Sequence, residues 1–109
     1  MTSFSIGDVV LVRYPFSDSS ISKIRPAVVI SAPHVSHDIF LLPLTSRTGS
    51  LLSGEFVLVD WSAAGLHIAS AAKRGIYTVH RDLVIKTVGK LSTADLDLLR
   101  KSIRQWLGL

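Results

Sequence analysis

The sequence predicts a mainly β domain that ends in one C-terminal helix. Short runs of β-branched and aliphatic residues recur along the chain, turn-forming residues separate them, and helical periodicity is confined to residues 92–108. This pattern favours a small antiparallel barrel or sandwich over βαβ units. With 109 residues, the chain is near the commonest domain size, so one domain over residues 1–109 is expected.

The first half of the chain contains three predicted strands. Residues 9–14 form a β-branched run that Pro15 ends, and residues 26–31 begin with a proline, where the missing N–H does least harm. Residues 39–44 form the third run, in which Pro43 indicates an edge or a bulge. The polar segments 16–24 and 46–54 have no periodicity and are expected to be loops.

The second half predicts three more strands, at residues 55–59, 76–79 and 83–88, with a turn at 60–66. A helix then follows. Ser92 is its expected N-cap, with Asp95 three residues later, and Gly108 is a fitting stop. Its apolar stripe, which must dock on the sheet, consists of Leu96, Leu99, Ile103 and Trp106 or Leu107.

Composition limits the functions that the chain can perform. The chain has no cysteine, which excludes disulfides and cysteine nucleophiles and is compatible with a reducing cytoplasm. Its N-terminus does not resemble a signal peptide, and no run approaches the roughly 18 apolar residues of a membrane helix. We therefore expect a cytoplasmic protein with no membrane partner. The formal charge of +4 favours polyanionic partners.

Two motifs with possible chemistry are weak. His34 and His37 lie three residues apart, but in a turn, and no third ligand stands at a suitable spacing. The string HRDL at 80–83 copies the start of a kinase catalytic loop, but the other kinase motifs are missing. No metal site and no cofactor are therefore expected.

Polar residues at the ends of two predicted strands form the strongest candidate site. Arg25 stands just before the second strand, and Thr45, Ser46 and Arg47 follow the third. If these strands are antiparallel neighbours, the start of one and the end of the other meet at one rim of the sheet. An arginine and a hydroxyl would then share a small site.

The whole-chain pattern resembles the MazF/PemK family of toxin endoribonucleases. The matching stretches, in order, are GDVVLV at 7–12 with YPF at 14–16, RPAVVIS at 25–31, PLTS at 43–46 and GKLS at 89–92. The resemblance implies a small SH3-like barrel with a C-terminal helix and a homodimer. It also implies metal-independent cleavage of single-stranded RNA and inhibition by a cognate antitoxin.

Within that resemblance, Arg25 and Thr45 match the family's catalytic arginine and threonine. A fixed guanidinium can hold the phosphoryl oxygens bidentately while a ribose 2′-OH attacks the adjacent phosphate, and a hydroxyl donor adds a second contact. Because the nucleophile belongs to the substrate, a DNA strand should not be cut.

The segment before the fifth predicted strand departs from the family. Some relatives carry an arginine and a nearby aspartate there, whereas this chain has Lys73 and Arg74, with Gly75 near the position of the carboxylate. The general base is therefore unassigned, with Asp18 and His80 as candidates. Lys73 and Arg74 are expected to bind RNA phosphates; Ser46 and Asp18 complete the predicted substrate-binding residues.

Three functions follow from this pattern. The leading one is an endoribonuclease toxin. The second is a weak or inactive relative that binds RNA or an antitoxin, which the missing carboxylate keeps open. The third, a toxin that acts on a protein such as gyrase, rests on analogy of fold alone.

Overall fold

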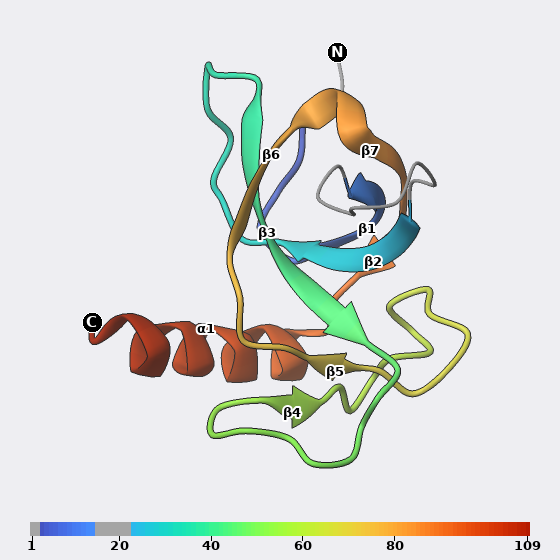
Figure 1. Cartoon of the computed structure of the whole chain (residues 1–109), viewed down its shortest axis with the longest axis vertical. Helices are drawn as coiled ribbons and strands as arrows, with labels where there is room; N and C mark the ends of the chain where they lie inside the picture. Colours follow the sequence, from blue (N-terminus) through green and yellow to red (C-terminus); the bar gives the residue numbers. More distant parts are fainter. Residues whose placement is uncertain (1–2, 15–22) are drawn as a thin grey trace.

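The structure, a computed structural model, describes residues 3–14 and 23–109 (Figure 1). In this part of the chain it contains antiparallel strands, one 3-10 turn and one C-terminal helix. The elements are β1 (Asp8–Tyr14), β2 (Lys23–Val29), β3 (Asp38–Thr45), β4 (Phe56–Val57), β5 (Ala71–Ala72), β6 (Tyr77–His80), η1 (Arg81–Leu83), β7 (Val84–Lys90) and α1 (Thr93–Leu107). The predicted fold class, mainly β with a C-terminal helix, is confirmed.

The strands form one strongly curved sheet. Their order is β4-β5-β3-β2-β1-β7, and β6 also pairs with β3, beyond the point where β5 leaves it. Figure 1 shows the sheet curling so that β6, η1 and β7 come round toward β1. Within the described residues no ladder joins β6 to β7, so the barrel is incompletely closed.

The two faces of the curved sheet pack into two separate hydrophobic cores. Val9 and Val28 point toward α1, where they pack with Leu99. Their chain neighbours, such as Val10 and Val29, point to the inside of the curl. Because successive strand residues face opposite sides of a sheet, one short β-branched run can supply both cores.

The helix forms as the sequence predicts. The Ser92 side chain accepts a hydrogen bond from the Asp95 backbone N–H at 3.2 Å, and Gly108 ends the helix in the left-handed conformation, with φ 68°. Of the two residues proposed to end the apolar stripe, Trp106 packs against the core and Leu107 is half exposed.

The β2 boundary corrects two predictions. The strand begins at Lys23, so Pro26 lies inside it and residues 23 and 24 do not belong to a loop. Pro26 pairs with Leu11 of β1, while the ladder to β3 starts one residue later, at Ala27. Pro26 therefore lies outside the β2–β3 ladder, where a missing N–H is tolerated. Residues 15–22 of the predicted loop lie outside the described residues.

Two other differences concern the sheet edge. The edge or bulge predicted at Pro43 is wrong: β3 is an interior strand without a register shift, and Pro43 pairs with Ala27 of β2. On its other side Pro43 lies between the β6 and β5 ladders, where a missing N–H is tolerated. The predicted strand 55–59 shortens to Phe56–Val57, and its partner Ala71–Ala72 was not predicted. Alanine has a low strand propensity, so residues 71 and 72 form a strand because they pair with β3 and β4.

Within the described residues, no helix has the length and apolar character needed to cross a membrane.

Candidate functional site

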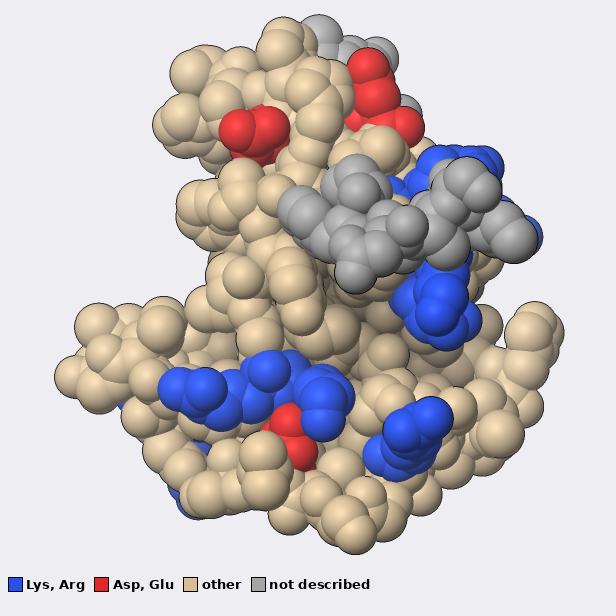
Figure 2. Space-filling model, in the orientation of Figure 1, with Lys and Arg blue, Asp and Glu red and all other residues tan. Residues whose placement is uncertain are grey.

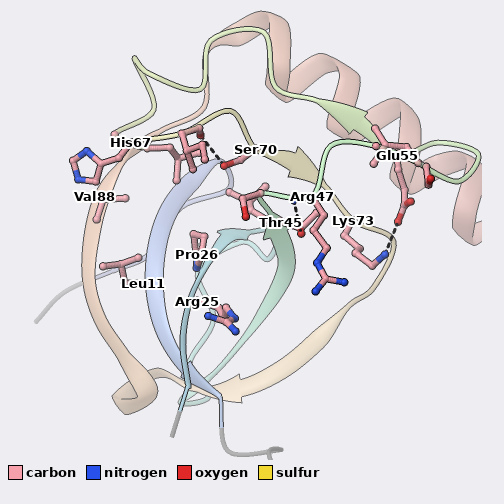
Figure 3. A pocket seen from close by; sticks show the side chains of 18 of the residues that line it. Leu11, Arg25, Pro26, Thr45, Arg47, Glu55, His67, Ser70, Lys73 and Val88 are labelled. Carbon is pink, nitrogen blue, oxygen red and sulfur yellow. Dashed lines mark hydrogen bonds and ion pairs between the residues drawn. The ribbon is translucent and has the colours of Figure 1, made fainter.

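A cavity of about 1010 Å³ opens on the α1 side of the sheet, beyond the part that the helix covers (Figure 3). Its floor continues the apolar rows of the helix-side core. Leu11 follows Val9 by two residues, and Pro26 precedes Val28 by two, so both face the cavity. The loop 46–54 and the segment 65–68 form its walls. The site is thus an extension of the core face, left open to solvent.

The cavity is strongly cationic. Figure 2 shows Lys and Arg side chains gathered around an acidic one in the lower half of this view. The charged residues that line the cavity are the cations Arg25, Arg47, Lys73 and Lys86 and one carboxylate, Glu55. Among the described residues, Arg25, Arg47 and Lys86 have no carboxylate within 4.0 Å. Cations left without acidic partners attract an anionic ligand.

Arg25 and Thr45 line the same cavity, as the predicted pairing of their strands requires. Ala27 pairs with Pro43 in the antiparallel ladder, which brings the start of β2 beside the end of β3. The Thr45 Oγ1 accepts a hydrogen bond from the Arg47 N–H at 3.1 Å. Because the hydroxyl is an acceptor in that bond, its own O–H remains available to donate to a ligand.

Glu55 is a cavity residue that sequence reasoning missed. Its Oε1 accepts a hydrogen bond from the Leu52 N–H at 2.7 Å, and its Oε2 accepts one from the Arg74 N–H at 2.8 Å. Chiefly the Arg74 N–H, and then the Leu52 N–H, lower the pKa of this carboxyl. The Lys73 ammonium lies 3.8 Å away. With both oxygens occupied and a lowered pKa, Glu55 is poorly suited to act as a general base.

The role of Glu55 is to anchor the loop 46–54 to the chain after β5. One signal in the sequence could have drawn attention to it: Glu55 is the only acidic residue between Asp38 and Asp60. Its partners, however, are backbone groups three and nineteen residues away, which no sequence pattern identifies.

Helix α1 holds the same loop from its other side. The Ser102 Oγ donates to the Gly54 carbonyl at 2.7 Å, and the Trp106 Nε1 donates to the Ser53 carbonyl at 3.0 Å. The Gln105 Nε2 adds a bond to the Ser53 Oγ at 2.8 Å. The end of the loop is therefore fixed between the helix and Glu55.

The opposite wall of the cavity is built by close backbone packing. A Cβ atom on Gly65 would collide with the Val88 carbonyl, and one on Gly89 would collide with the Ala64 carbonyl. Only glycine permits this approach of the turn to β7, and it brings His67 beside Val88 (Figure 3). The His67 ring points away from Arg25 and Thr45.

The remaining predicted site residues divide into three groups. Ser46 and Lys73 line the cavity with Arg25 and Thr45. Arg74 does not line it; the Arg74 N–H serves the Glu55 anchor instead. Asp18 lies outside the described residues.

His80, the other candidate base, lies outside the cavity. Its ring stacks on His37, with centroids 5.5 Å apart, and its Nδ1 accepts a hydrogen bond from the Asp82 N–H at 3.1 Å. In the described part of the chain, no three or more His, Asp or Glu side chains form a group that could hold a metal ion.

The fold and the site define a small, barrel-like β domain with a docked helix and an open cationic cavity, and such a charge distribution favours anionic ligands. The sequence model of the family described as "PemK-like, MazF-like toxin of type II toxin-antitoxin system" matches residues 5–107. The chain therefore belongs to this toxin family.

Solved structures agree with the family assignment. An endoribonuclease from Mycobacterial species is 17% identical, with a TM-score of 0.78, and the match covers 100% of this chain and 95% of that one. MazF from Deinococcus radiodurans is 17% identical, with a TM-score of 0.77 and full coverage of both chains. A MazE–MazF structure from the same organism is 19% identical, with a TM-score of 0.76 and 96% coverage of each chain. No curated protein matches the sequence.

Proposed function

We propose that this toxin is an endoribonuclease that cleaves single-stranded RNA without a metal ion. The observation that carries the proposal is the presence of Arg25 and Thr45 in one open cationic cavity. Family membership and fold neighbours described as endoribonucleases support it.

In the proposed reaction the substrate supplies its own nucleophile. The ribose 2′-oxygen forms a bond to the adjacent phosphorus, and the bond from phosphorus to the 5′-oxygen of the next nucleotide breaks. The 2′-OH gives up its proton to water and the leaving 5′-oxygen takes one up, so the products are a 2′,3′-cyclic phosphate and a 5′-hydroxyl. Negative charge builds on the non-bridging oxygens during this step, so donors aimed at them lower the barrier.

Arg25 and Thr45 are suited to that task. The Arg25 guanidinium has no acidic partner among the described residues, so its donors can face a phosphoryl group. The Thr45 O–H, with its oxygen already fixed by the Arg47 N–H, can donate to the same group. Ser46 and Lys73 line the same cavity and would bind the flanking backbone.

Cleavage of a long single-stranded RNA in EDTA tests this proposal. Wild type should cut the RNA and leave 5′-hydroxyl ends, whereas the matching DNA should stay intact. Arg25→Ala and Thr45→Ala should each lower kcat by about 100-fold or more, the scale of losing one oxyanion donor. Lys101→Ala, on exposed helix surface away from the cavity, is the matched control.

Intact RNA that is still retarded in a gel shift would contradict the enzyme proposal and favour the binding module. Full activity in both the Arg25 and Thr45 variants would contradict their assigned roles.

We further infer that the toxin forms a homodimer and is inhibited by a cognate antitoxin in the cytoplasm. One structural neighbour is described as an endoribonuclease in complex with its cognate antitoxin, and two others as MazE–MazF. Large apolar side chains on the strands are exposed, including Phe40 at 47% and Ile85 at 45%, and such surfaces are typical of interfaces. Light scattering after size exclusion should give twice the monomer mass; a monomer at micromolar concentration would contradict the dimer.

A further inference from the structure

We infer that Lys86 and His67 form a second phosphate-binding subsite at the β7 end of the cavity, opposite Lys73. The ligand is a phosphate of the same RNA strand, one that flanks the cleaved bond. This inference rests on the proposed function and assigns residues that the resemblance to known toxins did not supply.

The register of the sheet is the first argument. Pro26, Leu11 and Lys86 are partners across β2, β1 and β7, so they lie in one row across the cavity floor. Neighbouring strands are about 4.8 Å apart, so Lys86 stands about 10 Å from Pro26. Arg25 is next to Pro26 in the chain. Its own row runs to Val12 and Val84, next to the row of Pro26, and Arg25 and Lys86 line the same cavity. An RNA strand bound at Arg25 can therefore place a flanking phosphate at Lys86.

The charge of Lys86 is the second argument. Its side chain is exposed and has no carboxylate within 4.0 Å among the described residues. Lys73, at the other end, already has Glu55 as a neighbour at 3.8 Å. Of the two lysines, Lys86 at the β7 end is therefore the one without a carboxylate neighbour. A lysine that contacts a phosphate releases the counterions of that phosphate, which favours binding and makes it depend on salt.

The rigid wall beside Lys86 is the third argument. The Gly65 and Gly89 packing fixes the turn against β7, and His67 follows this turn by two residues. Lys86 precedes Val88, which contacts Gly65, by two residues, and both Lys86 and His67 line the cavity. Figure 3 shows His67 over Val88, across the cavity from Lys73. An imidazole N–H can donate to a phosphate oxygen that Lys86 holds.

The salt dependence of binding to a 2′-O-methyl RNA oligonucleotide tests the subsite, because this probe cannot be cleaved. Lys86→Ala should weaken binding about two- to fivefold and reduce the slope of log K against log salt by roughly 0.7. On cleavable RNA, it should raise KM more than it lowers kcat. Lys101→Ala removes a cation of the helix surface that does not line this cavity, and it should leave the slope unchanged.

His67→Ala should also weaken binding, and the Lys86–His67 double variant should lose less than the product of the two single effects. If the loss of affinity in the double variant equals the product of the two single losses, His67 does not act together with Lys86 and is not part of the subsite. Wild-type binding with an unchanged slope in Lys86→Ala would overturn the subsite and leave the proposed function intact. Failure of wild type to bind or cut RNA would overturn both.

Discussion

The Glu55 carboxylate and the Lys73 ammonium lie 3.8 Å apart, yet the Glu55 side chain is 2% exposed and that of Lys73 is 54% exposed. A cation so open to solvent contributes little to stability through this pair. Glu55 is instead held by two backbone N–H groups, which leaves Lys73 able to turn toward a ligand.

Glu55→Gln should destabilise the fold by about 1–2 kcal/mol, because an amide has one acceptor oxygen for two N–H donors. The folded-state pKa of Glu55 lies below its ordinary value of 4.5, so its contribution is present above that pH and is lost as the pH falls through the folded value. Urea unfolding from pH 3 to pH 7 should show a smaller pH dependence in the variant. An equal dependence would contradict the anchor.

Asp95→Asn should be more costly, at about 3 kcal/mol. The Asp95 carboxylate is fully buried and accepts hydrogen bonds from the Val59 and Asp60 N–H groups at 2.8 Å each. An amide would turn a donor toward one of these donors. Asp97→Asn, on the exposed face of the same turn, is the control and should change stability by less than about 0.5 kcal/mol. Equal effects of the two variants would show that the buried carboxylate has no special role.

Gly89→Ala should lower the unfolding temperature strongly, because the new methyl group collides with the Ala64 carbonyl and neither backbone can yield cheaply. Gly49→Ala is the matched control: nothing lies within 4 Å of its added Cβ. Calorimetry of both variants checks the difference. Two similar melting curves would mean that the turn does not pack on β7 as closely as described.

Tyr14→Phe should leave stability unchanged or raise it by about 1 kcal/mol, because the buried Tyr14 hydroxyl has no hydrogen-bond partner among residues 3–14 and 23–109. Burial first, and Tyr77 second, raise the pKa of Tyr14 to about 12. Between pH 10 and 12 the unfolded chain can ionise Tyr14 while the folded chain keeps it neutral. The free energy of unfolding is therefore unaffected by Tyr14 ionisation below pH 10 and falls between pH 10 and 12. Chemical unfolding at pH 8 and pH 11 should show a smaller alkaline loss in the variant. A loss at pH 8 would reveal a bond that the hydroxyl makes.

The helix and the pairing of the second and third strands could be predicted because their signals are local. Ser92, Gly108 and the apolar stripe define the helix without reference to the rest of the chain. The proximity of Arg25 and Thr45 was predicted from one assumption, that the second and third strands are antiparallel neighbours. The β2–β3 ladder satisfies it.

The rest of the site depends on contacts between distant segments. The Glu55 anchor exists only because β4 and β5 pair, and the Ala71–Ala72 strand has no propensity that would announce it. Lys86 could have been found, since it lies two residues before Val88 and lines the cavity with it, but only with the sheet order in hand. Position in the sheet, not residue type, distinguishes these side chains from other surface charges.

The two-sided attachment of the loop 46–54 divides it into two parts with different freedom to evolve. From Leu52 onward its backbone is committed to Glu55 and to helix α1, so substitutions there alter the fold. Residues 46–51, with the exception of Thr48, line the cavity and make fewer such bonds. Exchange of a few residues in this stretch can therefore change what the cavity binds, while the scaffold that presents them stays the same.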